Sequence, residues 1–179
     1  MAAARTRSIG RVISEQHRKV RTTTMIDKNK LLNLVVTELG RAVEQMDQAT
    51  DAQRLDVSKQ EGAMQSRYDT HRIEGSWLAD AMQVRRDELT RQLRLARSYR
   101  LADSAHAHVC EGSLAYLLIR GNRAVYFVLP FAAGHELVLD GEEVTVVSPD
   151  SPLARELLGK VRSDRVAFRG QIVELEDVK

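Results

Sequence analysis

Two groups of residues in this sequence have types and spacings that could support binding or chemistry. In the first group, His106, His108 and Cys110 alternate, so on a strand their side chains would share one face. Imidazole and thiolate are usual zinc ligands, but a structural zinc site needs four ligands. The remaining candidate, His135, lies in a predicted loop. We therefore predict a linker strand with incidental polar residues and no bound metal.

The second group is a run of arginines within a predicted helix. Arg91, Arg94, Arg97 and Arg100 recur every three residues. Such a basic face could contact the phosphates of RNA or the acidic groups of a protein partner. A charge run is more often a solvated helix face. Both interpretations stay open at this stage, and salt-dependent binding to RNA would separate them.

The composition limits the possible classes of protein. The chain has 179 residues, 43% of them hydrophobic and 4% aromatic, which allows one domain or two small ones. Lys and Arg number 27 against 25 Asp and Glu, and this balance does not by itself indicate nucleic-acid binding. The single cysteine excludes a disulfide-stapled secreted scaffold and suits a reducing cytosol. No apolar run reaches membrane-spanning length, so we expect a cytoplasmic protein without a membrane partner.

Residues 1–27 form a basic segment that differs from the rest of the chain. Six of its residues are basic against the acids Glu15 and Asp27, and no apolar stretch follows that would make it a secretory signal. An Arg-rich transit peptide is an alternative, but we expect a disordered basic tail. Met25 could be the true start of the protein.

Residues 28–102 contain no proline and predict a helical hairpin. Apolar residues recur at alternating spacings of three and four, the pattern of a coiled-coil seam. On the first helix they are Leu32, Val35, Leu39, Ala42, Met46 and Ala49. On the second they are Ile73, Trp77, Leu78, Ala81, Met82, Leu89, Leu93 and Ala96. The polar stretch between the helices predicts a tip near residues 53–63, and Trp77 is expected to pack in the seam.

Residues 105–179 hold all three prolines and most of the β-branched runs. The predicted strands are residues 113–120, 124–131, 144–147, 165–168 and 171–175. One short helix interrupts them, with Ser151 as its cap, Pro152 at its first position and Gly159 at its end. The chain as a whole is therefore α+β, with a coiled-coil hairpin followed by a small antiparallel sheet and one helix.

The run from Val147 to Lys160, with its Ser-Pro-Asp-Ser-Pro-Leu corner and following Ala-Arg-Glu-Leu-Leu helix, resembles the GreA/GreB family of bacterial transcription elongation factors. The resemblance covers about residues 28–179 and implies an FKBP-like C-terminal domain. It also implies that RNA polymerase is the partner and that the hairpin enters the secondary channel of the polymerase. The positions implied to bind polymerase are Asp150, Ser151 and Pro152, with Leu153 beside them. The same residues could instead only shape and cap the corner.

The resemblance further implies a pair of acids at the hairpin tip that helps the polymerase hold a second Mg²⁺ for transcript cleavage. Alignment on Tyr68 places the pair on Glu61 and Met64, and a thioether cannot serve as a Mg²⁺ ligand. A gapped alignment would recruit Asp56. We therefore expect a monomeric polymerase-binding regulator without efficient cleavage, not an enzyme, with no cofactor of its own beyond the Mg²⁺ of the polymerase.

Three alternatives follow from the same residues. The chain could be a true cleavage factor that uses Glu61 with Asp56. It could be a coiled-coil adaptor with no role at the polymerase. It could also be an FKBP-like binding module or isomerase with an aromatic pocket, for which the candidates are Tyr116, Tyr126, Phe127, Phe131 and Phe168.

Overall fold

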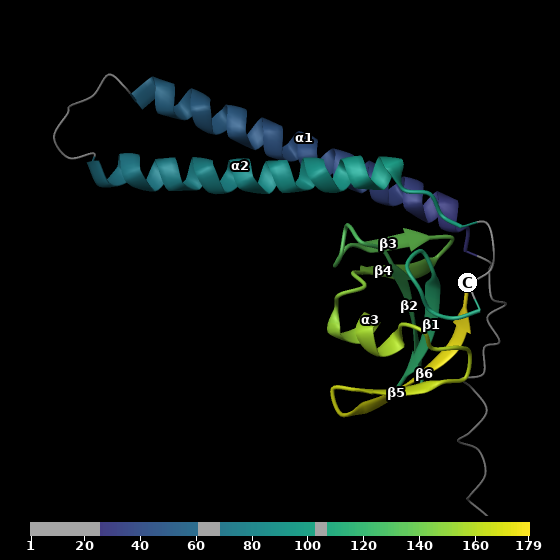
Figure 1. Ribbon diagram of the computed structural model, residues 1–179. Helices are drawn as coiled ribbons and strands as arrows, with labels where there is room; N and C mark the ends of the chain where they lie inside the picture. The colour runs from purple at the N-terminus through teal and green to yellow at the C-terminus, as the bar shows by residue number, and fades with distance from the viewer. Residues whose placement is uncertain (1–25, 61–68, 103–106) are drawn as a thin grey trace, which may run out of the picture.

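The computed structural model describes residues 26–60, 69–102 and 107–179, with side chains described for 26–52, 77–102 and 107–179. Two long helices, α1 (Lys28–Gln60) and α2 (Asp69–Ser98), run side by side and project past the sheet that follows them (Figure 1). The α+β class is confirmed. The start of α1 is set by Asp27, whose Oδ1 accepts hydrogen bonds from the backbone amides of Asn29 and Lys30 at 2.9 and 3.2 Å.

The first helix is longer than the sequence pattern predicts. We expected the chain to reverse near residues 53–63, but α1 stays helical to Gln60. The reason is local, because residues 50–60 are polar yet include neither glycine nor proline, so nothing in them ends a helix. Residues 61–68, between the two helices, lie outside the described part of the chain.

The second part of the chain is one six-stranded sheet crossed by a short helix. Its strands are β1 (Leu114–Ile119), β2 (Asn122–Val128), β3 (Glu136–Leu139), β4 (Glu142–Val147), β5 (Arg165–Phe168) and β6 (Gln171–Val178). The helix α3 (Pro152–Leu157) connects β4 to β5. The strand order is β3-β4-β2-β1-β6-β5, so β3 and β5 are the two edges.

The expected all-antiparallel sheet is wrong for one pair of strands. β2 and β4 run parallel, with Val125 opposite Val144, while the other neighbours are antiparallel. The cause is β3, a four-residue strand that the sequence pattern did not reveal. Because β3 forms a hairpin with β4 at the sheet edge, β4 is returned beside β2 in the same direction as β2.

The sheet has a separate hydrophobic core on each face. Along the central strand β1, Leu114 and Tyr116 face one core, whereas Ala115 and Leu117 face the other. This alternation is what a strand buried on both faces requires. The core under α3 consists of Val109, Ala115, Leu117, Val128, Leu153, Leu157, Val166, Val173, Leu175 and Val178.

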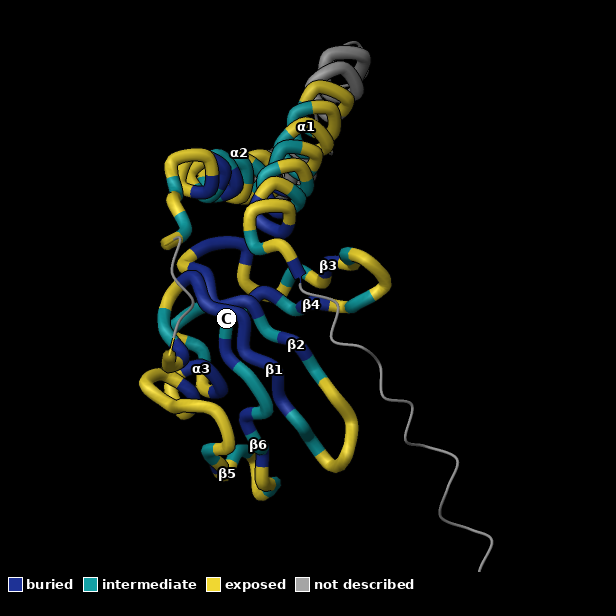
Figure 2. The backbone as a smooth tube through the Cα atoms, turned by 90° about the vertical axis from the view of Figure 1, so that its right-hand side faces the viewer, coloured by how far each residue is buried: buried dark blue, intermediate teal, exposed yellow. Residues whose placement is uncertain are grey.

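The core on the opposite face is shared between the sheet and the base of the hairpin. The helices contribute Leu31, Leu32, Val35, Leu39, Leu89, Leu93 and Ala96, preceded by Ile26. The sheet and its loops contribute Leu114, Tyr116, Val125, Phe127, Leu129, Phe131, Ala132, Leu137, Val144 and Val146. Figure 2 shows this continuous buried region where the helices meet the sheet. The hairpin and the sheet are therefore packed as one unit.

Two specific contacts reinforce this junction. The rings of Tyr99 and Phe131 meet edge to face, with centroids 5.3 Å apart and an interplanar angle of 80°. The side-chain oxygen of Gln92 accepts a hydrogen bond of 3.1 Å from the backbone amide of Ala132. Both contacts connect the last turns of α2, or the residue that follows it, to the loop between β2 and β3.

Beyond the base of the hairpin, the described side chains form no fully buried seam, although Ala42, Val43 and Met46 are partly buried against the shared core. Among the side chains described for the two helices, none beyond Leu39 on α1 and none before Leu89 on α2 is buried. The helices separate toward the tip (Figure 1), and Asp47 and Arg86 form an ion pair between them. The expectation that Trp77 packs in the seam is wrong, because its side chain is 69% exposed.

None of the described helices combines the length and apolarity that a membrane span would require.

The burial pattern predicts opposite outcomes for two substitutions in α2. Leu93→Ala removes a side chain from the shared core and should lower the free energy of unfolding by about 2–5 kcal/mol. Trp77→Ala should change it by no more than about 0.5 kcal/mol, since most of the indole is already in water. Chemical denaturation of both variants measures this. A loss above 1 kcal/mol for Trp77→Ala would restore the seam interpretation.

Candidate functional site

The corner between β4 and α3 is built by short local hydrogen bonds. After Val147 the chain leaves the sheet, and the hydroxyl of Ser148 accepts a hydrogen bond of 3.2 Å from the Asp150 amide. The Ser148 carbonyl accepts one of 2.9 Å from the Ser151 amide. These bonds fold residues 148–151 into a tight turn, which places Asp150 at its outer edge.

Ser151 starts the helix. It has an extended backbone, with φ −64° and ψ 148°, and its hydroxyl oxygen accepts a hydrogen bond of 3.2 Å from the Ala154 amide. Pro152 follows at the first helical position, where the missing N–H has no cost. The helix ends after Leu157, and Gly159 takes the left-handed backbone, φ +78°, that favours glycine after a helix.

The four residues implied to bind polymerase are therefore placed differently. Asp150 has a side chain 91% exposed, and among the described residues its one ion-pair contact is a 3.6 Å approach to the Arg155 guanidinium. Ser151 is half-buried and Pro152 is exposed. Leu153 is the exception, because it is 8% exposed and packs in the core under α3. Its side chain faces the sheet and is not available to a partner.

The capping role and the exposed carboxylate belong to different residues. Since the Ser151 hydroxyl caps the helix, Asp150 is not needed for that purpose. An exposed aspartate on a turn fixed by its neighbours can accept hydrogen bonds from a partner at little cost in ordering. This division makes Asp150 the best-supported contact residue at the corner.

The predicted tip acids fall where the structure describes no side chains. Asp56 lies within α1, in the part whose side chains are not described, and Glu61 lies outside the described residues. The cleavage pair thus remains a prediction from sequence.

The four arginines predicted for the second helix do not lie on one face, and they differ in their contacts. Each step of three residues turns a helix by about 300°, so the positions from 91 to 97 drift by about a third of a turn around the axis. Arg91 is bound to Glu88 through two hydrogen bonds of 2.8 and 2.9 Å. Arg100 lies beyond the end of α2 and donates to the carbonyls of Arg97 and Tyr99 at 3.2 and 3.1 Å. Arg94 and Arg97 are exposed.

The residues considered as zinc ligands are not brought together in the described part of the chain. His106 lies outside it, His108 is exposed, Cys110 is half-buried, and no strand forms at residues 107–112. No cluster of three or more histidine, cysteine or acidic side chains that could hold a metal occurs within residues 26–52, 77–102 and 107–179. Burial raises the pKa of the Cys110 thiol, and the Lys28 ammonium partly opposes this shift.

The aromatic residues considered for an isomerase pocket are divided between the two faces of the sheet. Tyr116, Phe127 and Phe131 belong to the core shared with the hairpin. Tyr126 and Phe168 pack against the core under α3. The sheet separates the two sets, so these side chains do not line a common pocket.

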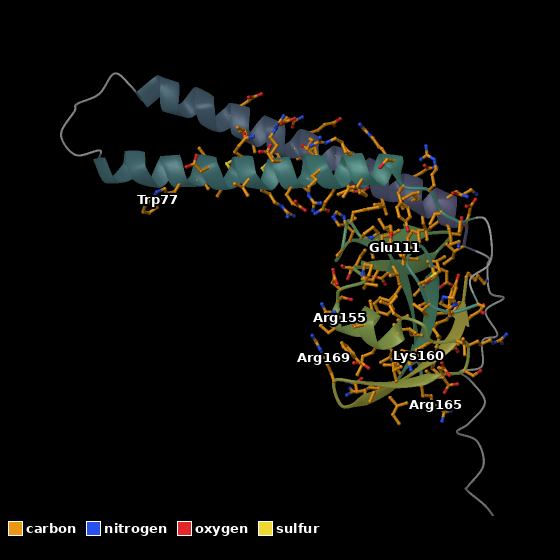
Figure 3. All side chains as sticks on the ribbon, viewed as in Figure 1. Trp77, Glu111, Arg155, Lys160, Arg165 and Arg169 are labelled. Atoms are coloured by element: carbon orange, nitrogen blue, oxygen red, sulfur yellow. The ribbon has the colours of Figure 1, made fainter. Side chains whose placement is uncertain are left out.

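Sequence reasoning missed the exposed residues that continue from the corner along α3. Arg155, Lys160 and Arg162 are all exposed, as are Leu158 and Val161. Figure 3 shows Arg155 and Lys160 near α3. The basic residues at positions 155–169 are the signal in the sequence, but the sequence does not show which of these side chains share one surface.

Comparison with known proteins gives a weak likeness in structure alone. No protein-family model matches the chain, and no curated protein matches it. A crystal structure of Thermus aquaticus Gfh1 is 17% identical with a TM-score of 0.32, covering 79% of this chain and 92% of that one. GreA factor homolog 1 (Gfh1) of Thermus thermophilus is 18% identical with a TM-score of 0.32, covering 83% and 94%.

A further structure, of the transcription factor Gfh1, is 15% identical with a TM-score of 0.34, covering 80% of this chain and 92% of that one. Values this low do not establish a family or a function. The functional interpretation therefore depends on the residues of the chain itself.

The separation of roles at the corner can be measured by stability. Ser151→Ala removes the cap and should lower the free energy of unfolding by about 1 kcal/mol. Asp150→Asn should leave it within about 0.5 kcal/mol, because the carboxylate is exposed and caps nothing. Denaturant titration of both variants decides the matter. Equal losses would mean that Asp150 is also structural.

The Glu88 carboxylate predicts a pH dependence. Hydrogen bonds from Arg91 and then Gln92 lower its pKa from 4.5 to about 2. A pKa lowered by folding contributes stability that is complete above about pH 4.5 and is lost as the pH falls toward 2. Glu88→Gln should therefore lower Tm at neutral pH and flatten the fall of Tm in that window. Glu156→Gln, which changes an acid outside this network, is the control.

Proposed function

We propose that this chain binds RNA polymerase and places its helical hairpin in the secondary channel, where it alters transcription by occupying space. The proposal is supported by the resemblance of residues 147–160 to the GreA/GreB family together with the hairpin-and-sheet arrangement that this resemblance implies.

The observation that carries the proposal is the exposed carboxylate of Asp150 on a turn fixed by hydrogen bonds. Its side chain is 91% exposed at a turn fixed by Ser148, beside a helix that is capped without its help. A charged group held in this way loses little conformational freedom when a partner binds. The same corner in an adaptor unrelated to polymerase would need no exposed carboxylate there.

The shared core explains how a contact at the corner would also orient the hairpin. Because the base of the hairpin packs into the sheet, a partner that holds the corner also sets the direction in which the hairpin points. At 1.5 Å per residue, the 33 residues of α1 extend about 50 Å. The outer half of the hairpin, which has no buried seam among its described side chains, would enter the channel.

Binding to polymerase tests the proposal. Purified RNA polymerase should retain the wild-type chain, and Asp150→Asn should weaken the complex by about tenfold or more. Glu156→Gln is the matched control, since it neutralises another exposed acid, on α3. The proposal fails if the wild type does not bind, or if Asp150→Asn binds as well as the wild type and the control.

The expected lack of cleavage is tested separately with backtracked transcription complexes. Added wild-type protein should not accelerate cleavage of the 3′-extended RNA, because Met64 stands where the resemblance implies a second acid. Acceleration that disappears in Glu61→Ala would instead favour the cleavage-factor alternative. Acceleration that persists in this variant would exclude Glu61 as its cause.

A further inference from the structure

The hairpin of β3 and β4 is a sheet edge whose charges all have one sign. From His135 to Val147 the chain includes acids but neither lysine nor arginine. The acids are Glu136, Asp140, Glu142 and Glu143, and all of them except the half-buried Glu142 are exposed. Val138 lies among them with 68% of its surface exposed. The acidic edge is defined here as Glu136, Val138, Asp140 and Glu143.

The strand register places most of the acidic edge on the face of the sheet away from the helical hairpin. Leu137 belongs to the core shared with the helices, and side chains alternate along a strand, so Glu136 and Val138 face the other side. Val138 lies directly opposite Glu143 on β4. The core under α3 takes none of its buried residues from β3 or β4. An apolar side chain flanked by carboxylates is therefore open to solvent here.

No cation in the described part of the chain neutralises these acids. None of the four acids between His135 and Val147 forms an ion pair with a described residue. Arg123, on the adjoining strand β2, is instead paired with Glu176 at 3.6 Å. The acidic edge thus has an excess of negative charge that is not balanced by its described neighbours.

A segment of opposite charge joins the structure beside this edge. Residues 1–25 include six lysines and arginines and one acid, Glu15. The next residue, Ile26, is 5% exposed and belongs to the same core as Leu137. The helix α1 contacts β3 and begins next to it (Figures 1 and 2). At about 3.3 Å per residue, 25 residues can span about 80 Å, so the acidic edge is well within reach.

We propose that the basic residues 1–25 dock on the acidic edge of the same chain. The run Arg11-Val12-Ile13 combines a cation with two apolar side chains, which complements Val138 between its carboxylates. Attachment at Ile26 gives the segment an effective concentration of about the millimolar range, so a few weak contacts suffice. The inference goes beyond the proposed function and does not depend on binding to polymerase.

Charge reversal on both sides of the contact tests the proposal in the full chain. Glu136→Lys with Glu143→Lys reverses the edge, and Arg7→Glu with Arg11→Glu reverses the segment. A fourfold variant that combines the two pairs restores opposite charges. The matched control, Glu44→Lys with Glu156→Lys, makes the same change in net charge at exposed acids on α1 and α3. Thermal unfolding confirms that each variant folds.

The measurement is paramagnetic relaxation enhancement by NMR. A nitroxide is attached at Ser8→Cys in a Cys110→Ser background, and the broadening of the Val138 amide signal is compared with that of Val166 on the far edge strand β5. The wild type and the control should show strong broadening at Val138. Reversal of either the edge or the segment should reduce it about fivefold or more, and the fourfold variant should recover it. High salt should also remove it.

If the reversed edge does not fold, Glu136→Gln with Glu143→Gln should show a smaller loss in the same direction. Equal broadening at Val138 and Val166 in the wild type overturns the inference, and so does a reversed edge that behaves like the control. If the wild type shows no broadening but the reversed edge self-associates, the acids only protect an edge strand from pairing, which also overturns it. Broadening seen only between labelled and unlabelled copies would assign the contact to a second chain and overturn docking within one chain.

Discussion

The hydrophobic core shared by the hairpin base and one face of the sheet is the constraint on which the other features depend. A two-helix hairpin has little interior of its own, and among the hairpin side chains that the structure describes the buried ones lie near the sheet. Burial against Phe127, Phe131 and Leu137 compensates for what the helices cannot provide to each other. The result is a rigid angle between a projecting arm and a compact base.

Because of this shared core, the two halves of the hairpin differ in how well they tolerate substitutions. Near the sheet, the buried side chains of both helices pack into the shared core. Farther out, the Asp47–Arg86 ion pair lies between separating helices and Trp77 faces solvent. Exposed ion pairs contribute little to stability, so the outer half can change its surface at small cost to the fold. Such an arm suits a role in which its shape and surface matter more than its packing.

The corner before α3 shows how stability and recognition can be assigned to adjacent residues. Ser151 satisfies the helix end, and Leu153 anchors the helix in the core, which leaves Asp150 exposed between them. Because β-strands and backbone hydrogen bonds fix both ends of this segment, its exposed side chains are presented in one arrangement.

Much of this architecture follows from the sequence alone. The alternating spacing of Leu32, Val35 and Leu39 determined a helical seam, and the order Ser151, Pro152 and Gly159 determined where a short helix begins and ends, because both depend on local geometry. The sequence could not determine the parallel pairing of β2 and β4, which depends on where the short strand β3 is placed. It also misplaced Trp77, because its heptad position does not reveal that the helices diverge.

Only the tertiary structure decided which side chains of the corner face outward. In the sequence Asp150, Ser151, Pro152 and Leu153 form one motif, and their order identifies Ser151 as the cap but not which of the other side chains face outward. Packing of α3 on the sheet buries Leu153, engages Ser151 and exposes Asp150, because a helix that rests on a sheet can direct only one side into the core. The sequence therefore determined the motif, and the packing of its helix decided which residue is free to bind.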